Sequence, residues 1–158
     1  ALTLYDMHRI LMEAFGWSGH KLHGFIIDGE LYDAEGSASD RDERLITLGE
    51  IIENGISEFT YNYDYTAEWE IRISLLHPVE EAETPQGVVC IAGEGAPPPE
   101  HIGGALRFRR FLAALQKGNP DEQAEAQKEL SCDFNPDQWD LSTCNNCLLS
   151  LSLNIQKE

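Results

Sequence analysis

Two neighbouring segments in the middle of the chain alternate apolar and polar residues with a period of two, and this pattern constrains the fold most. The first runs from Glu58 to Tyr65 and the second from Trp69 to Leu75, with a short turn between them. Because side chains of a β-strand point alternately to opposite faces, each segment has one apolar face. We therefore predict two paired antiparallel strands whose apolar faces are covered by other elements.

A second hairpin is predicted nearer the start of the chain. Residues 21–27 and 30–32 flank Asp28-Gly29, a pair that accepts the positive φ angles of a tight two-residue turn. Shorter strands are predicted at residues 45–47 and 88–91, with a Pro- and Glu-rich separator at residues 77–86. We expect residues 33–44, which carry five acidic side chains, to form a solvated and mobile loop.

Helical periodicity with recognisable start and stop signals predicts amphipathic helices elsewhere. Thr3 is an N-cap residue before an apolar stripe that ends at Gly16, and Asn119-Pro120 starts another helix. The Pro97-Pro98-Pro99 run removes three backbone donors, so residues 93–104 are expected to form an irregular loop. The predicted helices span approximately residues 4–15, 49–53, 105–117, 120–130 and 141–151.

These elements predict one α+β domain over residues 1–158, with a mainly antiparallel sheet covered by about four helices. A chain of this length builds a single core, and its 42% hydrophobic content is sufficient for one. No apolar run approaches the roughly 18–20 residues that a membrane-spanning helix needs. The chain opens at Ala1 almost directly with a helical pattern, so we expect that a further segment precedes it.

The charge of the chain restricts its partners. It has 28 acidic and 11 basic residues, a formal net charge of −17, and such a field repels phosphate backbones. We therefore do not expect nucleic acid as a partner, and the lack of a long apolar run argues against a membrane, whereas a protein partner and the oligomeric state stay open. Arg107, Arg109, Arg110 and Lys117 form the one locally basic stretch, and we expect them to pair with acidic residues of the same chain.

Several short motifs along the chain occur in an order that resembles the plasmid pRiA4b ORF-3-like family. Its opening is matched by the residues from Leu4 to Leu11, by Phe15-Gly-Trp17 and by Leu22-His23-x-Phe25. Further matches are Tyr61-x-Tyr63-Asp64-Tyr65 before Trp69, Cys90-x-x-Gly93, Pro98-Pro-Glu100, Gly103-Gly104, Asp133-Phe-Asn-Pro136 and Trp139-Asp-Leu141. The resemblance spans nearly the whole chain.

The resemblance implies a protein of plasmids and insertion elements, a passenger sometimes labelled a resolvase, whose biochemical activity is not established. It also implies a further strand before the first helix. The resolvase label fits poorly, because Ser37, Ser39 and Arg41 lie in an acidic segment rather than an arginine-rich one. Several groups of the family are replaced in this chain. Thr66-Ala67 stands where the family has Gly-Asp, and Ile71 and Lys21 each stand where it has a histidine. Pro97 and Ile102 replace two cysteines, and His101 replaces an aspartate. These departures imply that possible metal-binding or catalytic groups have been lost.

The candidate site residues are His23, Asp64, Glu68, Glu100 and His101. Histidine and paired carboxylates could serve proton transfer or hydrolysis. The structural alternatives are a partly buried, hydrogen-bonded His23 and a solvated sheet face for Glu68 and its neighbour Glu70. His101 lies in the proline-rich loop, where irregular segments on rigid scaffolds often hold binding groups.

The four cysteines, Cys90, Cys132, Cys144 and Cys147, are expected to be reduced thiols of a cytoplasmic protein. Cys144-x-x-Cys147 has the spacing of half a zinc site. Its position within a helical apolar stripe favours small buried hydrophobic side chains instead. We therefore predict no metal and no cofactor.

The function that the sequence favours is that of a non-catalytic accessory or interaction protein of mobile-element origin. One alternative is a degenerate or cryptic metal-dependent hydrolase that uses Asp64, Glu68, His23 and Glu100 in a cleft. Another is an acidic DNA mimic that binds a basic DNA-handling protein through its charge.

Overall fold

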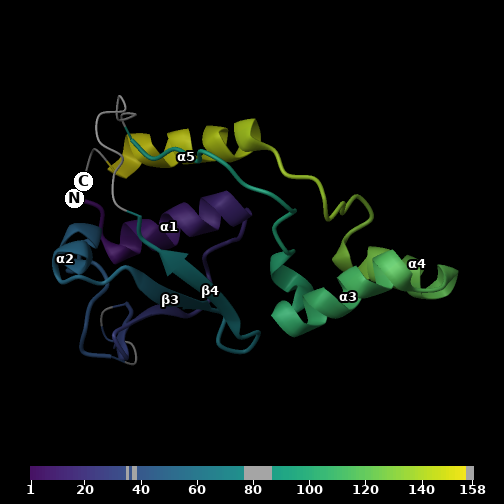
Figure 1. The fold of residues 1–158 in the computed structure, drawn as a ribbon, viewed down its shortest axis with the longest axis horizontal. Helices are drawn as coiled ribbons and strands as arrows, with labels where there is room; N and C mark the ends of the chain where they lie inside the picture. Colours follow the sequence, from purple (N-terminus) through teal and green to yellow (C-terminus); the bar gives the residue numbers. More distant parts are fainter. Residues whose placement is uncertain (35, 37–38, 77–86, 156–158) are drawn as a thin grey trace.

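The computed structural model describes residues 1–34, 36, 39–76 and 87–155 (Figure 1). Its elements, in chain order, are α1 (Leu4–Phe15), β1 (His23–Ile27), β2 (Glu30–Tyr32), α2 (Leu48–Glu53), β3 (Glu58–Tyr63), β4 (Trp69–Ser74), the 3-10 helix η1 (Glu100–Ile102), α3 (Ala105–Lys117), α4 (Pro120–Leu130) and α5 (Leu141–Ile155). The predicted α+β class is confirmed. The predicted separator at residues 77–86 lies outside the described residues.

The four strands form one antiparallel sheet in the order β2-β1-β3-β4, which confirms both predicted hairpins. Asp28 and Gly29 join β1 to β2 with φ angles of 50° and 80°, as a tight turn with positive φ requires. In the centre of the sheet Phe25 pairs with Tyr61, and at the far end of β3 Tyr63 pairs with Trp69. The alternation seen in the sequence therefore sets the register.

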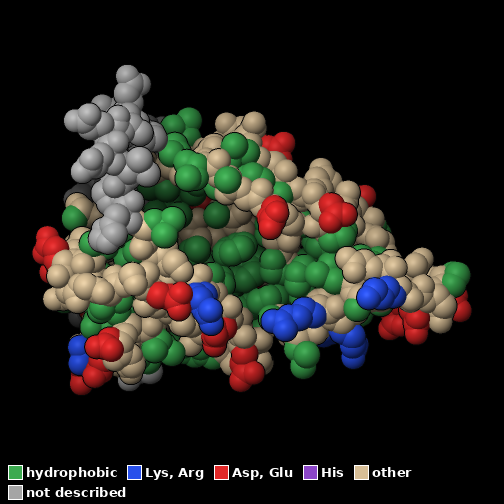
Figure 2. All heavy atoms as spheres, viewed as in Figure 1, with side chains coloured by type: hydrophobic (Ala, Val, Ile, Leu, Met, Phe, Trp, Pro, Cys, Tyr) green, Lys and Arg blue, Asp and Glu red, His purple; other side chains and the backbone are tan. Residues whose placement is uncertain are grey.

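The sheet has one apolar and one polar face, and helices cover the apolar face. Phe25, Tyr61 and Tyr63 are fully buried on it, whereas Glu70 and Arg72 are exposed on the opposite face. Helix α1 lies on the sheet and α5 packs along α1, which gives three layers (Figure 1). The helical hairpin α3–α4 extends from one end of these layers. Figure 2 shows apolar side chains in a hollow between α1 and α3, so this face of the core is partly open.

Both ends of α1 follow the predicted capping. Thr3 and Asp6 form a capping box, and Gly16 ends the helix with a φ angle of 67°. Backbone N–H groups in the first turn of the helix donate hydrogen bonds to another segment. The N–H of Leu4 bonds to the carbonyl of Ile46, and the N–H of Tyr5 bonds to the carbonyl of Glu43. These bonds anchor residues 43–46 at the start of α1.

Two short strands predicted from the sequence are absent from the described part of the chain, so these predictions were wrong. Residues 45–47 form no strand because their polar groups serve helix ends, and Thr47 caps α2 and makes one isolated bridge to Thr3. Residues 88–91 are not part of any strand of the described sheet. The side-chain amide of Asn145 in α5 takes the place of a strand, since it bonds both the N–H and the carbonyl of Cys90.

The acidic segment of residues 33–44 is not the wholly solvated loop that was predicted. Asp33 is completely buried and Glu43 is 1% exposed. Their backbones bond to each other, and Asp33 also accepts a hydrogen bond from the Ser39 hydroxyl. The polar composition concealed that two of its carboxylates point into the protein.

The α3–α4 hairpin is fixed by a close approach at Gly104. This residue has a φ angle of 102°, and a Cβ atom there would collide with the carbonyl of Ala67 in the β3–β4 turn. Arg107 forms an ion pair of 2.9 Å with Glu129, which confirms the predicted pairing within the chain for this residue. Among the described residues, Arg109, Arg110 and Lys117 form no such ion pair. None of the described helices is long and apolar enough to cross a membrane.

Candidate functional site

A group of polar side chains lies between the sheet and α1, and we call His8, His23, Glu43 and Tyr61 the buried histidine cluster. The rings of His8 and His23 stack in parallel with their centroids 3.6 Å apart. His8 Nδ1 lies 2.6 Å from the Tyr61 hydroxyl, and His23 Nε2 lies 3.1 and 3.2 Å from the two carboxylate oxygens of Glu43. The two imidazoles thus connect a phenol to a carboxylate through buried contacts.

Burial sets the electrostatics of this cluster. Desolvation, the neighbouring His23 and Arg9 lower the pKa of His8 to about 3, so His8 is neutral at physiological pH. Desolvation also raises the pKa of Tyr61, with contributions from Tyr63 and Glu43, so the phenol keeps its proton. His23 is the side chain that meets the Glu43 carboxylate. His23 is therefore partly buried and hydrogen-bonded, as its structural alternative predicted.

Glu100 lies in a second polar group, which we call the proline-loop cluster and define as Ser18, Tyr63 and Glu100. The Tyr63 hydroxyl donates to Glu100 at 2.6 Å, and the Ser18 N–H and hydroxyl donate to it at 2.9 and 2.8 Å. Burial alone would raise the pKa of Glu100, but these hydrogen bonds outweigh it and hold the pKa below its usual value. Close by, the Trp17 indole donates to the carbonyl of Pro98. The cluster fastens the proline-rich loop to the sheet.

The structure brings some of the predicted candidates together and separates others. His23 pairs with Tyr63 in the sheet, so the two clusters are neighbours. Asp64 directly follows Tyr63, but its carboxylate accepts hydrogen bonds from the backbone of the following turn and lies 3.9 Å from Lys21. The side chain of Glu68 is exposed in that turn.

His101 lies apart from the other candidates. Its Nε2 is 2.9 Å from the carbonyl of Glu129, so the ring contacts the end of α4. No hydrogen bond or ion pair in the described part of the chain links α4 to the other four candidates. His23, Asp64 and Glu100 thus surround one end of β3, and Glu68 and His101 make separate contacts.

The sequence reasoning missed His8, Glu43 and Tyr61 as members of a polar site. His8 had a usable signal, because it lies four residues from both Leu4 and Met12 and therefore shares their buried face of α1. The alternation of buried and exposed residues in β3 likewise indicated that Tyr61 is buried. Glu43 had no such signal, since only the folded chain places it opposite His23.

Three of the four cysteines lie at α5: Cys144 and Cys147 are part of it, and the backbone of Cys90 bonds to Asn145. Cys144 is buried, Cys90 and Cys147 are partly buried, and Cys132 is exposed. Within the ranges that the structure describes, no three His, Cys, Asp or Glu side chains are arranged to hold a metal ion.

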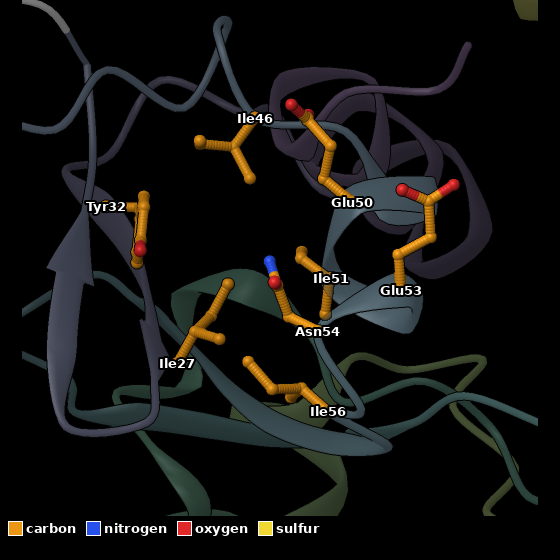
Figure 3. A pocket seen from close by; sticks show the side chains of 8 residues that line it. All are labelled: Ile27, Tyr32, Ile46, Glu50, Ile51, Glu53, Asn54 and Ile56. Carbon is orange, nitrogen blue, oxygen red and sulfur yellow. The ribbon is translucent and has the colours of Figure 1, made fainter.

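An open pocket of about 270 Å³ lies between the β1–β2 hairpin and α2 (Figure 3). Its walls are about equally apolar and polar, and the polar groups come from Glu50 and Glu53 of α2 and from Asn54 at the end of that helix. The apolar residues are Ile27, Tyr32, Ile46, Ile51 and Ile56. In Figure 3 the isoleucine side chains converge on the hollow from β1, from the segment before α2, from α2 itself and from the segment between α2 and β3. The pocket can therefore bury an aliphatic group beside negative charge.

Apolar side chains continue onto the surface next to this pocket. Leu45, which precedes the lining residue Ile46, is 74% exposed, and Ile52, which follows Ile51, is 38% exposed. On the face shown in Figure 2, acidic side chains are scattered over most of the molecule, whereas most of the visible lysine and arginine lies over α3 and the rest over the sheet side. The region around α2 thus combines exposed apolar and acidic groups.

Comparisons with known proteins give a family and a fold but no reaction. The family model described as plasmid pRiA4b ORF-3-like protein matches residues 1–143. A crystal structure of a protein of unknown function from Methanosarcina mazei Go1 is similar with a TM-score of 0.76 and 24% identity, and the match covers 89% of this chain and 82% of that one. No curated protein matches the chain.

Proposed function

This chain belongs to the plasmid pRiA4b ORF-3-like protein family, and on that premise we propose that it is a non-catalytic accessory domain of mobile-element origin that binds a basic protein partner. The contact surface is the pocket beside α2 together with its exposed apolar surroundings. The free cysteines fit a reducing compartment such as the cytoplasm.

The condition of the titratable groups supports a role without catalysis. A general acid or base needs a pKa near the operating pH and access to the substrate. His8 is neutral and buried against Tyr61, and Glu43 is buried against His23. Glu100 accepts three hydrogen bonds that hold the proline-rich loop in place. These groups are used to stabilise the fold.

The observation that carries the proposal is the pairing of an apolar pocket with carboxylates on α2. Hydrogen bonds from the Thr47 side chain and backbone lower the pKa of Glu50, which is therefore ionised at neutral pH. Glu53 has no ion pair among the described residues, so its charge is available. A side chain such as leucine fits the isoleucine walls, and a neighbouring lysine or arginine would meet Glu53.

The charge of the whole chain favours the same kind of partner. A net charge of −17 attracts a basic surface over long distances and accelerates encounter at low salt. Because such attraction alone is not selective, the apolar pocket would supply the specific contact. We therefore expect binding that needs both the leucine-like side chain and the positive charge.

The proposal is tested by titrating the protein with a blocked peptide of alternating lysine and leucine. The matched probe replaces every lysine by glutamate. With isotope-labelled isoleucine methyl groups, we expect the lysine peptide to shift the NMR signals of Ile46, Ile51 and Ile56. Equal shifts with both peptides, or lysine-peptide shifts spread evenly over the surface without these methyls, would contradict the proposal.

A charge reversal separates the pocket from general electrostatics. Glu53→Lys should weaken binding of the lysine peptide roughly fivefold, which corresponds to the upper range of about 1 kcal/mol for an exposed ion pair. The matched control is Glu70→Lys on the open face of β4, which changes the net charge equally. An equal loss in both variants would show that only net charge matters.

A further inference from the structure

Two cysteines that are far apart in the sequence, Cys90 and Cys144, line the same open pocket at the N-terminal part of α5. The pocket has a volume of about 270 Å³, and Phe15, Gly93 and Trp139 are among its other lining residues. We propose that Cys90 and Cys144 are a reversible redox pair, which a small-molecule disulfide such as glutathione disulfide converts to an intramolecular disulfide bond.

The backbone around Cys90 is held against α5 at the position next to Cys144. The Asn145 side-chain amide accepts from the Cys90 N–H at 2.7 Å and donates to the Cys90 carbonyl at 2.9 Å. Two hydrogen bonds to one residue fix both its distance from the helix and its orientation. The Cys90 backbone is therefore held against the turn of α5 that carries Cys144.

The pocket walls restrict movement on the other side of Cys90. A Cβ atom on Gly93 would lie 2.7 Å from the ring of Trp139, so only glycine allows this close packing. The Cys90 thiol donates to the carbonyl of Ala92 at 3.4 Å, which keeps the thiol within the same turn of chain. The segment thus presents one thiol at a defined place beside α5.

The two thiols differ in their access to solvent. Cys90 is partly buried and faces an open pocket, so a small disulfide reaches it first, whereas Cys144 is 7% exposed. Burial, together with the neighbouring thiols of Cys90 and Cys147, raises the pKa of Cys144. The buried Cys144 thiol is therefore not the one that reacts first.

The chemistry balances in two thiol–disulfide exchanges. The Cys90 thiolate attacks one sulfur of glutathione disulfide, forms a mixed disulfide and releases one glutathione thiolate. Cys144 then loses its proton to solvent and attacks the Cys90 sulfur, which releases the second glutathione. The protein loses two electrons and two protons, and the reagent is reduced to two molecules of glutathione.

Two other cysteines could compete, and their positions separate the outcomes. Cys147 follows Cys144 by three residues on α5 and could form a bond within the helix, whereas the exposed Cys132 could form a bond between molecules. A bond to Cys90 has a distinct consequence, since it would tie the segment before the proline-rich loop to α5.

The test is to incubate the whole chain with glutathione disulfide, block the remaining thiols and map the peptides after cleavage before aspartate. This cleavage places Cys90 in the peptide of residues 64–120, Cys132 in 121–132, and Cys144 with Cys147 in 140–158. We expect the first and last of these peptides to be joined and to separate again with dithiothreitol. The mapping uses the unaltered protein, so the result does not depend on a variant that folds.

Serine variants identify the partner of Cys90. Cys147→Ser and Cys132→Ser should leave the cross-link intact, whereas Cys144→Ser should abolish it and leave glutathione on Cys90. The proposal is overturned if the cross-link disappears in Cys147→Ser. It is also overturned if Cys144 bonds to Cys147 in the unaltered protein, or if the thiols of Cys90 and Cys144 both remain free.

Discussion

The buried histidine cluster and the pocket beside α2 lie in the same domain but use polar groups in opposite ways. In the cluster, His8, His23, Glu43 and Tyr61 contact one another away from solvent. At the pocket, isoleucine walls are open and Glu53 carries a charge for which the described residues provide no ion pair. The difference shows that titratable residues with pKa values shifted by burial can stabilise a core. Isoleucines and glutamates that match no motif can instead form a binding surface.

The comparison predicts the largest loss of stability when the cluster loses its carboxylate. Glu43→Ala should lower the free energy of unfolding by about 2–3 kcal/mol, because removal of the carboxylate leaves the partly buried His23 ring nitrogen without its hydrogen-bond partner. Urea unfolding measures the change. Glu70→Ala, on the exposed face of β4, is the control and should change stability by less than about 0.5 kcal/mol. Similar values for both variants would break the comparison.

A pH dependence is expected from His8. Its pKa is lowered to about 3 in the folded protein but is about 6.5 in an unfolded chain, so below pH 6.5 the unfolded state binds more protons. The stabilisation is therefore present above that pH and is lost as the pH falls towards 3, by at most about 1.4 kcal/mol per pH unit.

His8→Gln isolates this effect, because glutamine can still form hydrogen bonds but does not titrate. Between pH 7 and pH 5, unfolding free energies from urea titrations should fall more steeply in the unaltered protein, by about 2 kcal/mol overall. Parallel pH profiles for the two proteins would show that His8 is not kept neutral by the fold.

The proline-loop cluster should respond with an intermediate effect. Tyr63→Phe removes one of the three hydrogen bonds to Glu100 and should lower the free energy of unfolding by about 1 kcal/mol. The pKa of Glu100, followed by NMR of its carboxyl carbon, should rise because a bond to its ionised form is lost. Tyr65→Phe is the matched control, and an unchanged Glu100 pKa in Tyr63→Phe would contradict the assignment.

The smallest change of stability is expected at the pocket. Glu53→Lys should alter the free energy of unfolding by less than about 0.5 kcal/mol, since an exposed charge makes little net contribution to folding. Thermal and urea unfolding check this. A large loss of stability would mean that Glu53 supports the fold, and its loss of peptide binding would then need another explanation.

Much of the fold could be predicted because its signals are local. The Asp28-Gly29 turn, the Thr3 capping box and the alternation of β3 and β4 depend on residues a few positions apart. The strand predicted at residues 88–91 failed for the opposite reason. Its backbone partner is the side chain of Asn145, which is 55 residues away along the chain. Composition also misled at residues 33–44, because a count of acidic residues does not show which carboxylates are buried.

The candidate site could be predicted only in part. His23 and Glu100 were identified as polar residues of interest, and both contact neighbouring polar groups in the fold. His101 belongs to another contact with α4. The spacing of His8 from Leu4 and Met12 would have placed it in the core, but no spacing connects it to His23 or Glu43. The isoleucines of the pocket come from separate elements, and each alone has the pattern of an ordinary core residue.

The sequence by itself determined the strand register, the helix ends, the acidic charge and the motifs of the family, because these depend on neighbouring residues or on simple totals. Only the tertiary structure decided that His8 stacks on His23, that Glu43 is buried and that Cys90 lies against α5. The physical reason is that a buried polar contact depends on positions in space, and chain folding brings together residues between which no local pattern exists.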